Sequence, residues 1–321
     1  MFAWYDLWTL YRYRDQAQCL DTTLALTRGS PVGAWGVLDH LRLDKGSATC
    51  VLRSGNGTQP LIGQVRYSAG ERSARLAFVL PARGVDSLGV TALLEGLAQH
   101  AGAHGSHALL AEVEESSPLF EGLRRAGFGV FTWQRIWRIN AQRQEPGDAT
   151  IAWQPTSDLD HMAVRSLAHT LIPLLAQSAE PLPNTLEEGW VFTREQEVLA
   201  YAAPVYGPRG IVIQPLLHPA VEDVPALLHG LIAALPLQLG RPVYLVVRAY
   251  QSWLEPALEG LGAESGERQA VLVKHLTVAQ RKPVFATLNN TLEKHQPAML
   301  GMPGNETPLP LVQHKTEESL N

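Results

Sequence analysis

RLAFVLPARGVDSLGVTALLEGL, residues 75–97, aligns without a gap with RGIVIQPLLHPAVEDVPALLHGL, residues 209–231. The identical pairs are Arg75/Arg209, Pro81/Pro215, Val90/Val224, Ala92/Ala226, Leu93/Leu227, Leu94/Leu228, Gly96/Gly230 and Leu97/Leu231. Farther along, PLFEGL (118–123) matches PALEGL (256–261). Short leucine-rich helices can resemble each other by chance, but two matches in the same order favour an internal repeat.

Each copy has the pattern of a strand, a helix, a second strand and a short helix. In the first copy, residues 76–80 and 108–113 are apolar runs of strand length, and 211–213 and 243–247 correspond to them in the second. The helix between the first two strands has a buried stripe at helical spacing, formed by Val90, Leu93, Leu94, Leu97 and Ala101. Such a strand–helix–strand unit implies a parallel pair with a right-handed crossover. We therefore predict an α/β fold (α+β in some schemes), with a mixed twisted sheet flanked by helices in each copy.

The length of 321 residues is typical of two domains. The polar stretch NAQRQEPGDA, residues 140–149, contains proline and glycine and is typical of a linker. We predict an N-terminal domain over 1–140 and a C-terminal domain over 150–280. Residues 296–321 lack hydrophobic periodicity and are expected to form a flexible tail.

The stretch LRRAGFGVFTWQRIWRI, residues 123–139, predicts a helix end followed by a long strand. Gly127 stands where a left-handed residue would end the helix, and Ser117 with Pro118 is typical of its start. Alternation places Phe131, Trp133, Trp137 and Ile139 on one face of the strand, and Phe128, Val130 and Ile136 on the other. Because both faces are partly apolar, we expect the strand to be covered on both sides.

Composition excludes several classes of protein. The net charge of -5 argues against a general binder of nucleic acid or of anionic membranes. The two cysteines, Cys19 and Cys50, form no metal or disulfide pattern, and no apolar run approaches the roughly 20 residues that span a bilayer. The N-terminus lacks the uninterrupted apolar core of a signal peptide, so we expect a cytoplasmic protein.

The order of these elements resembles the GNAT superfamily of acyltransferases. The resemblance rests on the strand that ends in proline, on the ALL-type helix and on LFEGLRRAGFGVFTWQRIWRI (119–139). This last stretch is similar to the family's fourth helix, Gly-Phe corner and last strands. The resemblance covers about residues 50–139 and, more weakly, 150–279, as in tandem GNAT proteins. It implies that acetyl-CoA binds as co-substrate where two parallel strands diverge, with its pyrophosphate at the start of the following helix. The last strands would close the sheet and wall the substrate side.

The resemblance implies a cofactor site that this sequence keeps only in part. The family motif Q/R-x-x-G-x-G/A places its glycines on Leu88 and Val90, and a slip of one residue brings in Gly89. The cofactor-binding residues implied are Leu80, Arg83, Gly84, Ser87, Gly89 and Val90. In the second copy Glu222 and Asp223 stand where the phosphates would lie, so we expect at most one cofactor per chain.

The resemblance implies no retained general acid. The family's tyrosine position corresponds to Leu123 in the first copy and Leu261 in the second, and its capping asparagine corresponds to Ser116. Glu112, with Glu114 and Glu115, follows the strand that would line the divergence, and Glu112 is the candidate general base. A solvated acidic turn is the alternative interpretation of these glutamates.

Two other groups of residues raise weaker hypotheses. His100, His104 and His107 suggest a metal site, but glycines interrupt their helix and no cysteine or carboxylate completes the set, so we expect surface histidines and no metal. The run Tyr11–Arg14 mixes aromatic and basic residues, which suits stacking on nucleotides, but in an acidic chain a half-buried first strand is favoured.

The sequence thus predicts an acyl-CoA-dependent N-acyltransferase, with activity in the N-terminal domain and a small-molecule or peptide amine as acceptor. The alternative is a catalytically silent GNAT-like protein that binds a ligand or serves as a scaffold. No nucleic acid or membrane partner is expected, and a homodimer is one arrangement that the sequence leaves open. Fold analogy alone does not decide between these alternatives.

Overall fold

The fold was described from a computed structural model, which describes residues 6–30, 32, 46–53, 60–67, 71–81, 87–139, 151–180, 189–236 and 241–276. The predicted linker (140–149, between β6 and β7) and the predicted tail (296–321) lie outside these residues. Residues 1–279 belong to one structural unit. The helices among the described residues are α1 (Asp6–Tyr13), α2 (Thr22–Arg28), α4 (Ser87–Ala103), α5 (Pro118–Arg125), α6 (His161–Leu171), α7 (Leu174–Ala179), α8 (Val224–Ala234) and α9 (Glu255–Gly260), with 3-10 turns η1 (Arg14–Gln16), η3 (Asp158–Asp160) and η4 (Ala249–Leu254).

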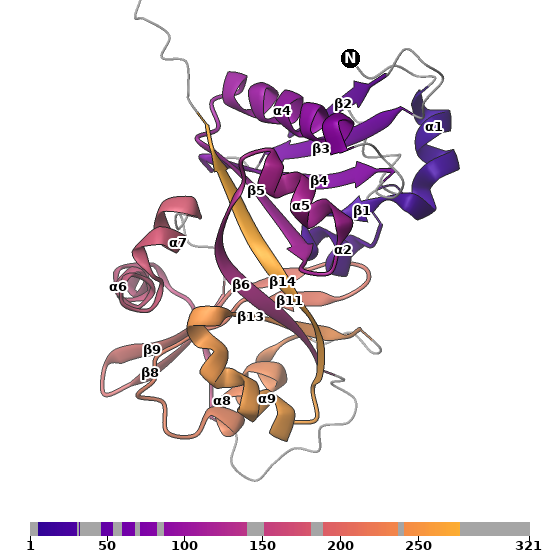
Figure 1. Cartoon of the computed structure of the whole chain (residues 1–321). Coiled ribbons are helices and arrows are strands. Elements are labelled where there is room, and N and C mark those ends of the chain that lie inside the picture. The colour runs from indigo at the N-terminus through magenta and orange to yellow at the C-terminus, as the bar shows by residue number, and fades with distance from the viewer. Residues whose placement is uncertain are drawn as a thin grey trace, which may run out of the picture. The chain divides into compact units, whose positions relative to one another are not determined.

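A large mixed sheet carries both copies of the repeat (Figure 1). Its strand order is β10 (Pro204–Tyr206), β11 (Ile211–Ile213), β13 (Val243–Arg248), β6 (Gly129–Ile139), β14 (Glu264–His275), β5 (Ala108–Glu114), β4 (Ser73–Leu80), β3 (Leu61–Tyr67) and β2 (Ser47–Leu52), with β1 (Gln18–Cys19) paired to β4. The parallel pairs are β4 with β5 and β11 with β13, as the repeat predicted. The predicted fold class, a mixed sheet flanked by helices, is confirmed.

The two halves exchange their last strands. β14, from the end of the second copy, lies between β5 and β6 of the first. In return β6, from the end of the first copy, pairs with β13 of the second, with Ile139 opposite Val243. In Figure 1 the two strands form a long ribbon through the middle of the molecule. β6 therefore lies inside the sheet, so the expectation that this stretch closes the sheet was wrong.

A smaller sheet belongs to the second half. Its order is β12 (Leu216–Leu217), β9 (Glu197–Ala202), β8 (Trp190–Arg194) and β7 (Gln154–Pro155). Helix α6 packs on it through Val164, Leu167 and Ala168. The chain passes from the large sheet to the small one between β11 and β12, at Gln214 and Pro215. Proline has no N–H to continue the ladder, which suits such a change of sheet.

Both faces of β6 are covered, as predicted. Helices α4 and α5 with Trp133, and α8 and α9 with Trp137, form the two largest apolar clusters on one face. On the other, Ile136 packs against Leu26 of α2. The side-chain pattern was predicted wrongly at one point, because a bulge in β6 breaks the alternation: Val271 and Leu272 of β14 face Thr132 and Val130, which leaves Phe131 as the extra residue. As a result Val130 packs on the same side as Trp133, whereas Phe131 packs with Ala108 and Leu110 on the opposite one.

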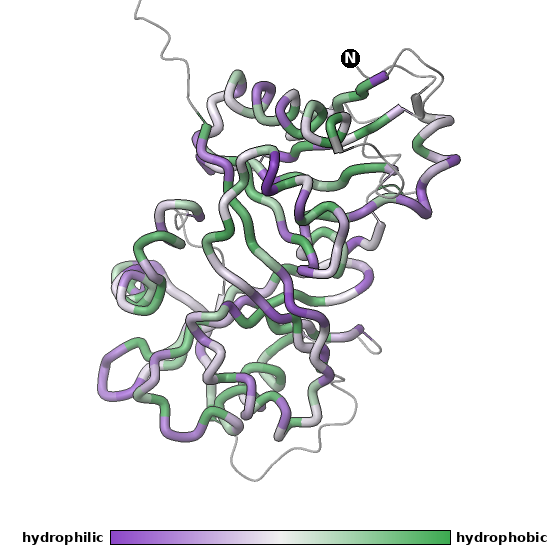
Figure 2. Tube along the Cα trace, in the orientation of Figure 1, coloured by the Kyte–Doolittle hydropathy of each residue, from purple (hydrophilic) through white to green (hydrophobic). Residues whose placement is uncertain are grey.

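The strand that β14 contributes changes character along its length. Residues 264–269 are polar and Ala270–Val273 are apolar, as the hydropathy colouring in Figure 2 shows. The apolar part is buried between β5 and β6, with Ala270 and Leu272 at 0% exposure. The polar part leaves the core and forms one wall of a cleft described below.

Helices α5 and α9 end in the same way. Gly127 after α5 has a φ of 84°, and Gly262 after α9 has a φ of 70°. In each case the next amide donates back into the helix, from Phe128 to the Leu123 carbonyl and from Ala263 to the Leu258 carbonyl. The predicted glycine stop, the Ser117 cap and Pro118 at the helix start are confirmed. By this geometry Leu258, rather than Leu261, corresponds to Leu123.

The prediction for Tyr11–Arg14 was wrong. Residues 6–13 form helix α1, whose Leu10 is fully buried while Trp8 and Tyr11 are exposed. A buried Leu10 with exposed neighbours suits a helix that lies on the protein surface. Alternation suggested a strand only because aromatic and basic residues alternate there. Of the described helices, none combines the length and apolar character needed to cross a bilayer.

Candidate functional site

Residues 18–20 of the chain bridge the gap between β4 and β5. Direct pairing of these parallel strands covers only Ser73–Arg75 and Ala108–Leu110. Beyond it, the Leu20 amide donates to the Ala77 carbonyl and the Glu112 amide donates to the Leu20 carbonyl, each at 2.9 Å. Gln18 and Cys19 add antiparallel pairing to β4. The interval in which the resemblance places acetyl-CoA therefore contains protein backbone, and as it stands does not fit that cofactor.

Buried polar contacts hold this bridge in place. Asp21 is 4% exposed, caps α2 through the Leu24 amide at 3.0 Å, and pairs with Arg66 at 3.2 Å. Burial raises the pKa of the Asp21 carboxyl, and burial raises the pKa of the Cys19 thiol to about 12. Leu20 is 1% exposed. Residues 18–20 are thus an integral part of the folded core.

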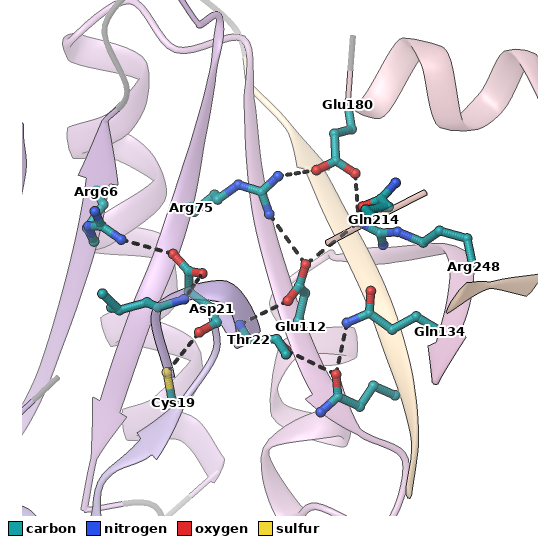
Figure 3. Close-up of polar contacts among 12 residues, drawn as sticks. Cys19, Asp21, Thr22, Arg66, Arg75, Glu112, Gln134, Glu180, Gln214 and Arg248 are labelled. Carbon is teal, nitrogen blue, oxygen red and sulfur yellow. Dashed lines mark hydrogen bonds and ion pairs between the residues drawn. The ribbon is translucent and has the colours of Figure 1, made fainter. Parts of the chain in front are cut away.

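Glu112, the candidate general base, is 6% exposed and already engaged (Figure 3). Its Oε2 accepts from the Thr22 amide at 2.9 Å. Its Oε1 lies 3.4 Å from Nη1 of Arg75 and 3.7 Å from Nη2 of Arg248. These contacts use both carboxylate oxygens to join β5 to the bridge and to the second half.

Glu112 belongs to a group of buried and half-buried polar and charged residues that we name the seam cluster: Arg75, Glu112, Glu180, Gln214 and Arg248. Glu180, which follows α7, binds Arg75 through Oε1 and Arg248 through Oε2, the latter at 2.9 Å. Burial raises the pKa of Glu180, but Arg248 and Arg75 outweigh burial and lower it to about 2. Figure 3 shows the two guanidinium groups converging on the two carboxylates from opposite sides. The cluster joins the halves by ion pairs.

Two hollows adjoin Thr22 and Glu112. The larger, which we name the open cleft, has a volume of about 820 Å³ and lies between η1, β1 and α2 on one side and the ends of β5, β6 and β14 on the other. Five carboxylates line it, and its basic group among the described residues is Arg138; the carboxylates are Asp15, Glu112, Glu114, Glu264 and Glu267. The smaller, which we name the seam cavity, has about 120 Å³ and adjoins the seam cluster.

The residues predicted to bind the cofactor lie in different environments. Leu80 and Val90 are buried at 0% and 5% exposure. Gly89 lies in the first turn of α4 beside Leu61. Ser87 begins α4, while Arg83 and Gly84 lie outside the described residues. In the second half Asp223 caps α8 by accepting from the Ala226 amide at 3.0 Å, and Glu222 pairs with Arg194. That helix start is therefore occupied by the protein's own carboxylates.

Sequence reasoning missed most of the seam cluster. Arg75 and Arg248 each adjoin an apolar run that forms a strand, and a charge in such a place is normally paired when buried. That signal was available in the sequence, although the partner Glu180 lies in a polar stretch that gives no such signal.

His100 and His104 contact each other with ring centroids 4.3 Å apart, and His104 stacks on Tyr67. Among the described residues no group of three or more ligating side chains is placed to hold a metal.

Comparisons with known proteins give structural likenesses only. No protein-family model matches the chain, and no curated protein matches it in sequence. Its fold is similar to a GCN5-related N-acetyltransferase from Sphaerobacter thermophilus, with 16% identity over 81% of this chain and 95% of that one, and a TM-score of 0.48. A GCN5-related N-acetyltransferase from Kribbella flavida has 16% identity over 71% and 90%, with a TM-score of 0.47.

A third likeness is to a tandem GNAT protein from the clavulanic acid biosynthesis pathway. Its identity is 16% over 73% of this chain and 85% of that one, and its TM-score is 0.44. The solved structures similar to this chain thus include GNAT acetyltransferases, the superfamily that the sequence resembles. At these identities the likeness extends to neither activity nor ligand.

Proposed function

We propose that this chain is a ligand-binding protein of GNAT-like fold that takes a cationic amine in the open cleft and transfers no acyl group to it. The observation that supports the proposal is the bridge at residues 18–20. Its backbone is hydrogen-bonded to both β4 and β5, so the interval between these strands is filled. The cleft behind the bridge stays open while the cofactor interval is closed.

The charges of the open cleft favour a cation. Glu112 is already paired with Arg75 and Arg248, so four carboxylates remain against one arginine. They produce a negative potential, which raises the local concentration of cationic ligands. Arg138 is itself partly neutralised by Glu264 at 3.7 Å. The volume of about 820 Å³ lies within the usual range for small-molecule sites. A molecule with several ammonium groups would use more of these carboxylates than a single amine.

Calorimetric titration with spermidine tests the amine site. We expect saturable binding to wild type that weakens with added salt, because the contributing charges are exposed. A Glu114→Gln, Glu267→Gln double variant should bind about 3–30-fold more weakly, at a few tenths to 1 kcal/mol per exposed charge. The matched control is Glu95→Gln, an exposed glutamate on α4 that does not line the cleft. Equal affinity of the double variant and the control would rule out the amine site.

The absence of transfer is tested separately. Wild type should show no heat of binding with acetyl-CoA, and mass spectrometry should find spermidine unmodified after incubation with both. Acetylated spermidine that depends on the protein would reject this part of the proposal and leave the amine site standing.

The second candidate is the N-acyltransferase, with activity in the N-terminal half. It is favoured by one observation, namely that Glu112 lines the open cleft and so adjoins the place proposed for the amine. In this reading acetyl-CoA binds through backbone groups between Leu80 and Val90, once residues 18–20 have left the interval. A Leu20→Gly variant, which weakens the bridge, should then bind acetyl-CoA more tightly than wild type, with at most one per chain. Arg83→Glu should weaken that binding.

A further inference from the structure

The order of the strands separates two kinds of side chain in the lining of the open cleft. In the large sheet β13, β6, β14 and β5 follow one another in that order (Figure 1). Tyr244 of β13 lies opposite Arg138 of β6, and Arg138 lies opposite Glu264 of β14. Residues opposite each other in antiparallel strands share one face of the sheet, and all three line the cleft. The cleft thus changes from an aromatic ring to a carboxylate across three neighbouring strands.

The side of the cleft next to β13 is apolar. Ile136 lies two residues before Arg138 on β6, so both side chains lie on the same face of the sheet. Leu26 of α2 and Tyr244 pack against the apolar cluster that contains Ile136, and the neighbouring Ala25 also lines the cleft. Ala25, Leu26 and Tyr244 are only half-buried, so they leave apolar surface open to the cleft.

The side of the cleft next to β5 is acidic. Glu264 and Glu267 belong to β14, and Glu114 ends β5, one strand farther from β13. All three glutamates are exposed and line the cleft. The apolar lining and the carboxylates therefore lie on different sides of a single cleft.

A ligand that carries charge along its whole length would leave the apolar side hydrated. Small-molecule sites are as a rule lined largely by apolar side chains, with a few polar groups that orient the ligand. An ammonium group laid over Leu26 would lose water without gaining a partner, which costs free energy. An apolar group in the same place would remove apolar surface from water, which lowers the free energy of binding.

We propose that the ligand of the open cleft is an amphipathic amine, in which one or more ammonium groups are joined to an apolar group about the size of one ring. The ammonium groups lie toward the carboxylates of β14 and β5. The apolar group lies over Ala25, Leu26 and Tyr244. This inference rests on the proposed amine site and names the class of amine that the site takes.

Calorimetric titration compares spermidine with spermidine that carries a benzyl group on one terminal nitrogen. The two ligands have the same number of ammonium groups, so a difference in affinity reports on the apolar side. The benzyl derivative should bind at least about tenfold more tightly, which corresponds to roughly 60 Å² of apolar surface removed from water. Binding of spermidine without a gain for the derivative would overturn this inference and leave the amine site standing. Binding of neither ligand would overturn the amine site, and this inference with it.

Variants of the two sides separate their contributions. Ala25→Gln places an amide on the apolar side and should reduce the gain from the benzyl group to less than about threefold, while the affinity for spermidine is kept. Ala92→Gln is the matched control, because Ala92 is exposed on α4 and does not line the cleft, and it should keep the full gain. The Glu114→Gln, Glu267→Gln double variant should weaken both ligands by the same factor. An undiminished gain in Ala25→Gln would show that the benzyl group binds elsewhere and would overturn the inference.

Discussion

The two halves of the molecule complete the same strand arrangement in different ways. In the first, β4 continues for eight residues and the interval beside it is filled by the backbone of residues 18–20. In the second, β11 ends after three residues, the chain leaves through Pro215 to the small sheet, and a cavity with buried ion pairs adjoins the place where the strands part. Corresponding elements thus leave one interval closed and the other partly open.

The comparison teaches that the repeat determines the order of elements but not the ligand sites. Pairing of the parallel strands stops after three residue pairs in both halves. In the first half the space beyond is filled by residues 18–20, which lie outside the repeat. In the second half Glu180, also outside the repeat, pairs with Arg248 at the end of β13. A duplicated fold can therefore carry two different sites, or one site and one filled interval.

The largest expected effect comes from removing β14. A chain that stops after Ala263 should lose cooperative unfolding altogether, because β5 and β6 of the first half would have no strand between them. Circular dichroism and thermal melting measure this. A truncated chain that still melts cooperatively would show that the halves are independent domains, as the predicted boundary at 140–150 implies.

The bridge should be worth several kcal/mol. Leu20→Ala removes a side chain that is 1% exposed and should destabilise the fold by about 2–5 kcal/mol in denaturant unfolding. The matched control is Leu88→Ala, since Leu88 is 75% exposed on α4 and should cost less than about 0.5 kcal/mol. Equal effects of the two substitutions would mean that residues 18–20 only rest against the sheet.

The seam cluster should respond to acid. The folded pKa of Glu180, about 2, is below its ordinary value of 4.5, so its contribution is fully present above pH 4.5 and is lost as the pH falls toward 2. We expect this loss to be on the order of 1–3 kcal/mol. Unfolding free energy measured between pH 6 and 2 should fall less steeply in Glu180→Gln than in wild type. Identical pH profiles would show that Glu180 is not held by the arginines in solution.

The smallest effects should be the same in both halves. Gly127 and Gly262 both have positive φ at the end of corresponding helices, and a Cβ there would meet nothing closer than 3.8 Å. Gly127→Ala and Gly262→Ala should therefore each cost about 1 kcal/mol, from backbone strain alone. Urea unfolding measures both. A cost in only one of them would indicate that the two helix ends are not equivalent.

Much of the fold could be predicted because its signals are local. The strands at 211–213 and 243–247, the buried stripe of α4 and the glycine after α5 depend on periodicity and turn chemistry within a few residues of each other. The exchange of β6 and β14 could not be, because apolar strands of similar composition pair equally well with several neighbours. The bulge that places Phe131 on the opposite face depends on that pairing, so the sequence alone could not predict it either.

Less of the candidate site could be predicted. Glu112 lies among the last residues of β5, near the strand end where the sequence placed it, and its role as a base stays a prediction. Its partners come from positions distant in sequence, Thr22, Arg75 and Arg248, and only tertiary structure assembles them. The filling of the cofactor interval by residues 18–20 was equally invisible, because the two residues of β1 carry no periodic pattern.

The exchanged strands also determine when the protein can fold during its synthesis. Residues 108–114 leave the ribosome long before their partner at 264–275 has been translated, at roughly 5–20 residues per second. Throughout that time the newly made first half exposes the unpaired edges of β5 and β6, which can pair with strands of other chains. The large sheet can therefore be completed only after β14 has been translated. Until then, we expect chaperones to protect the nascent chain from aggregation.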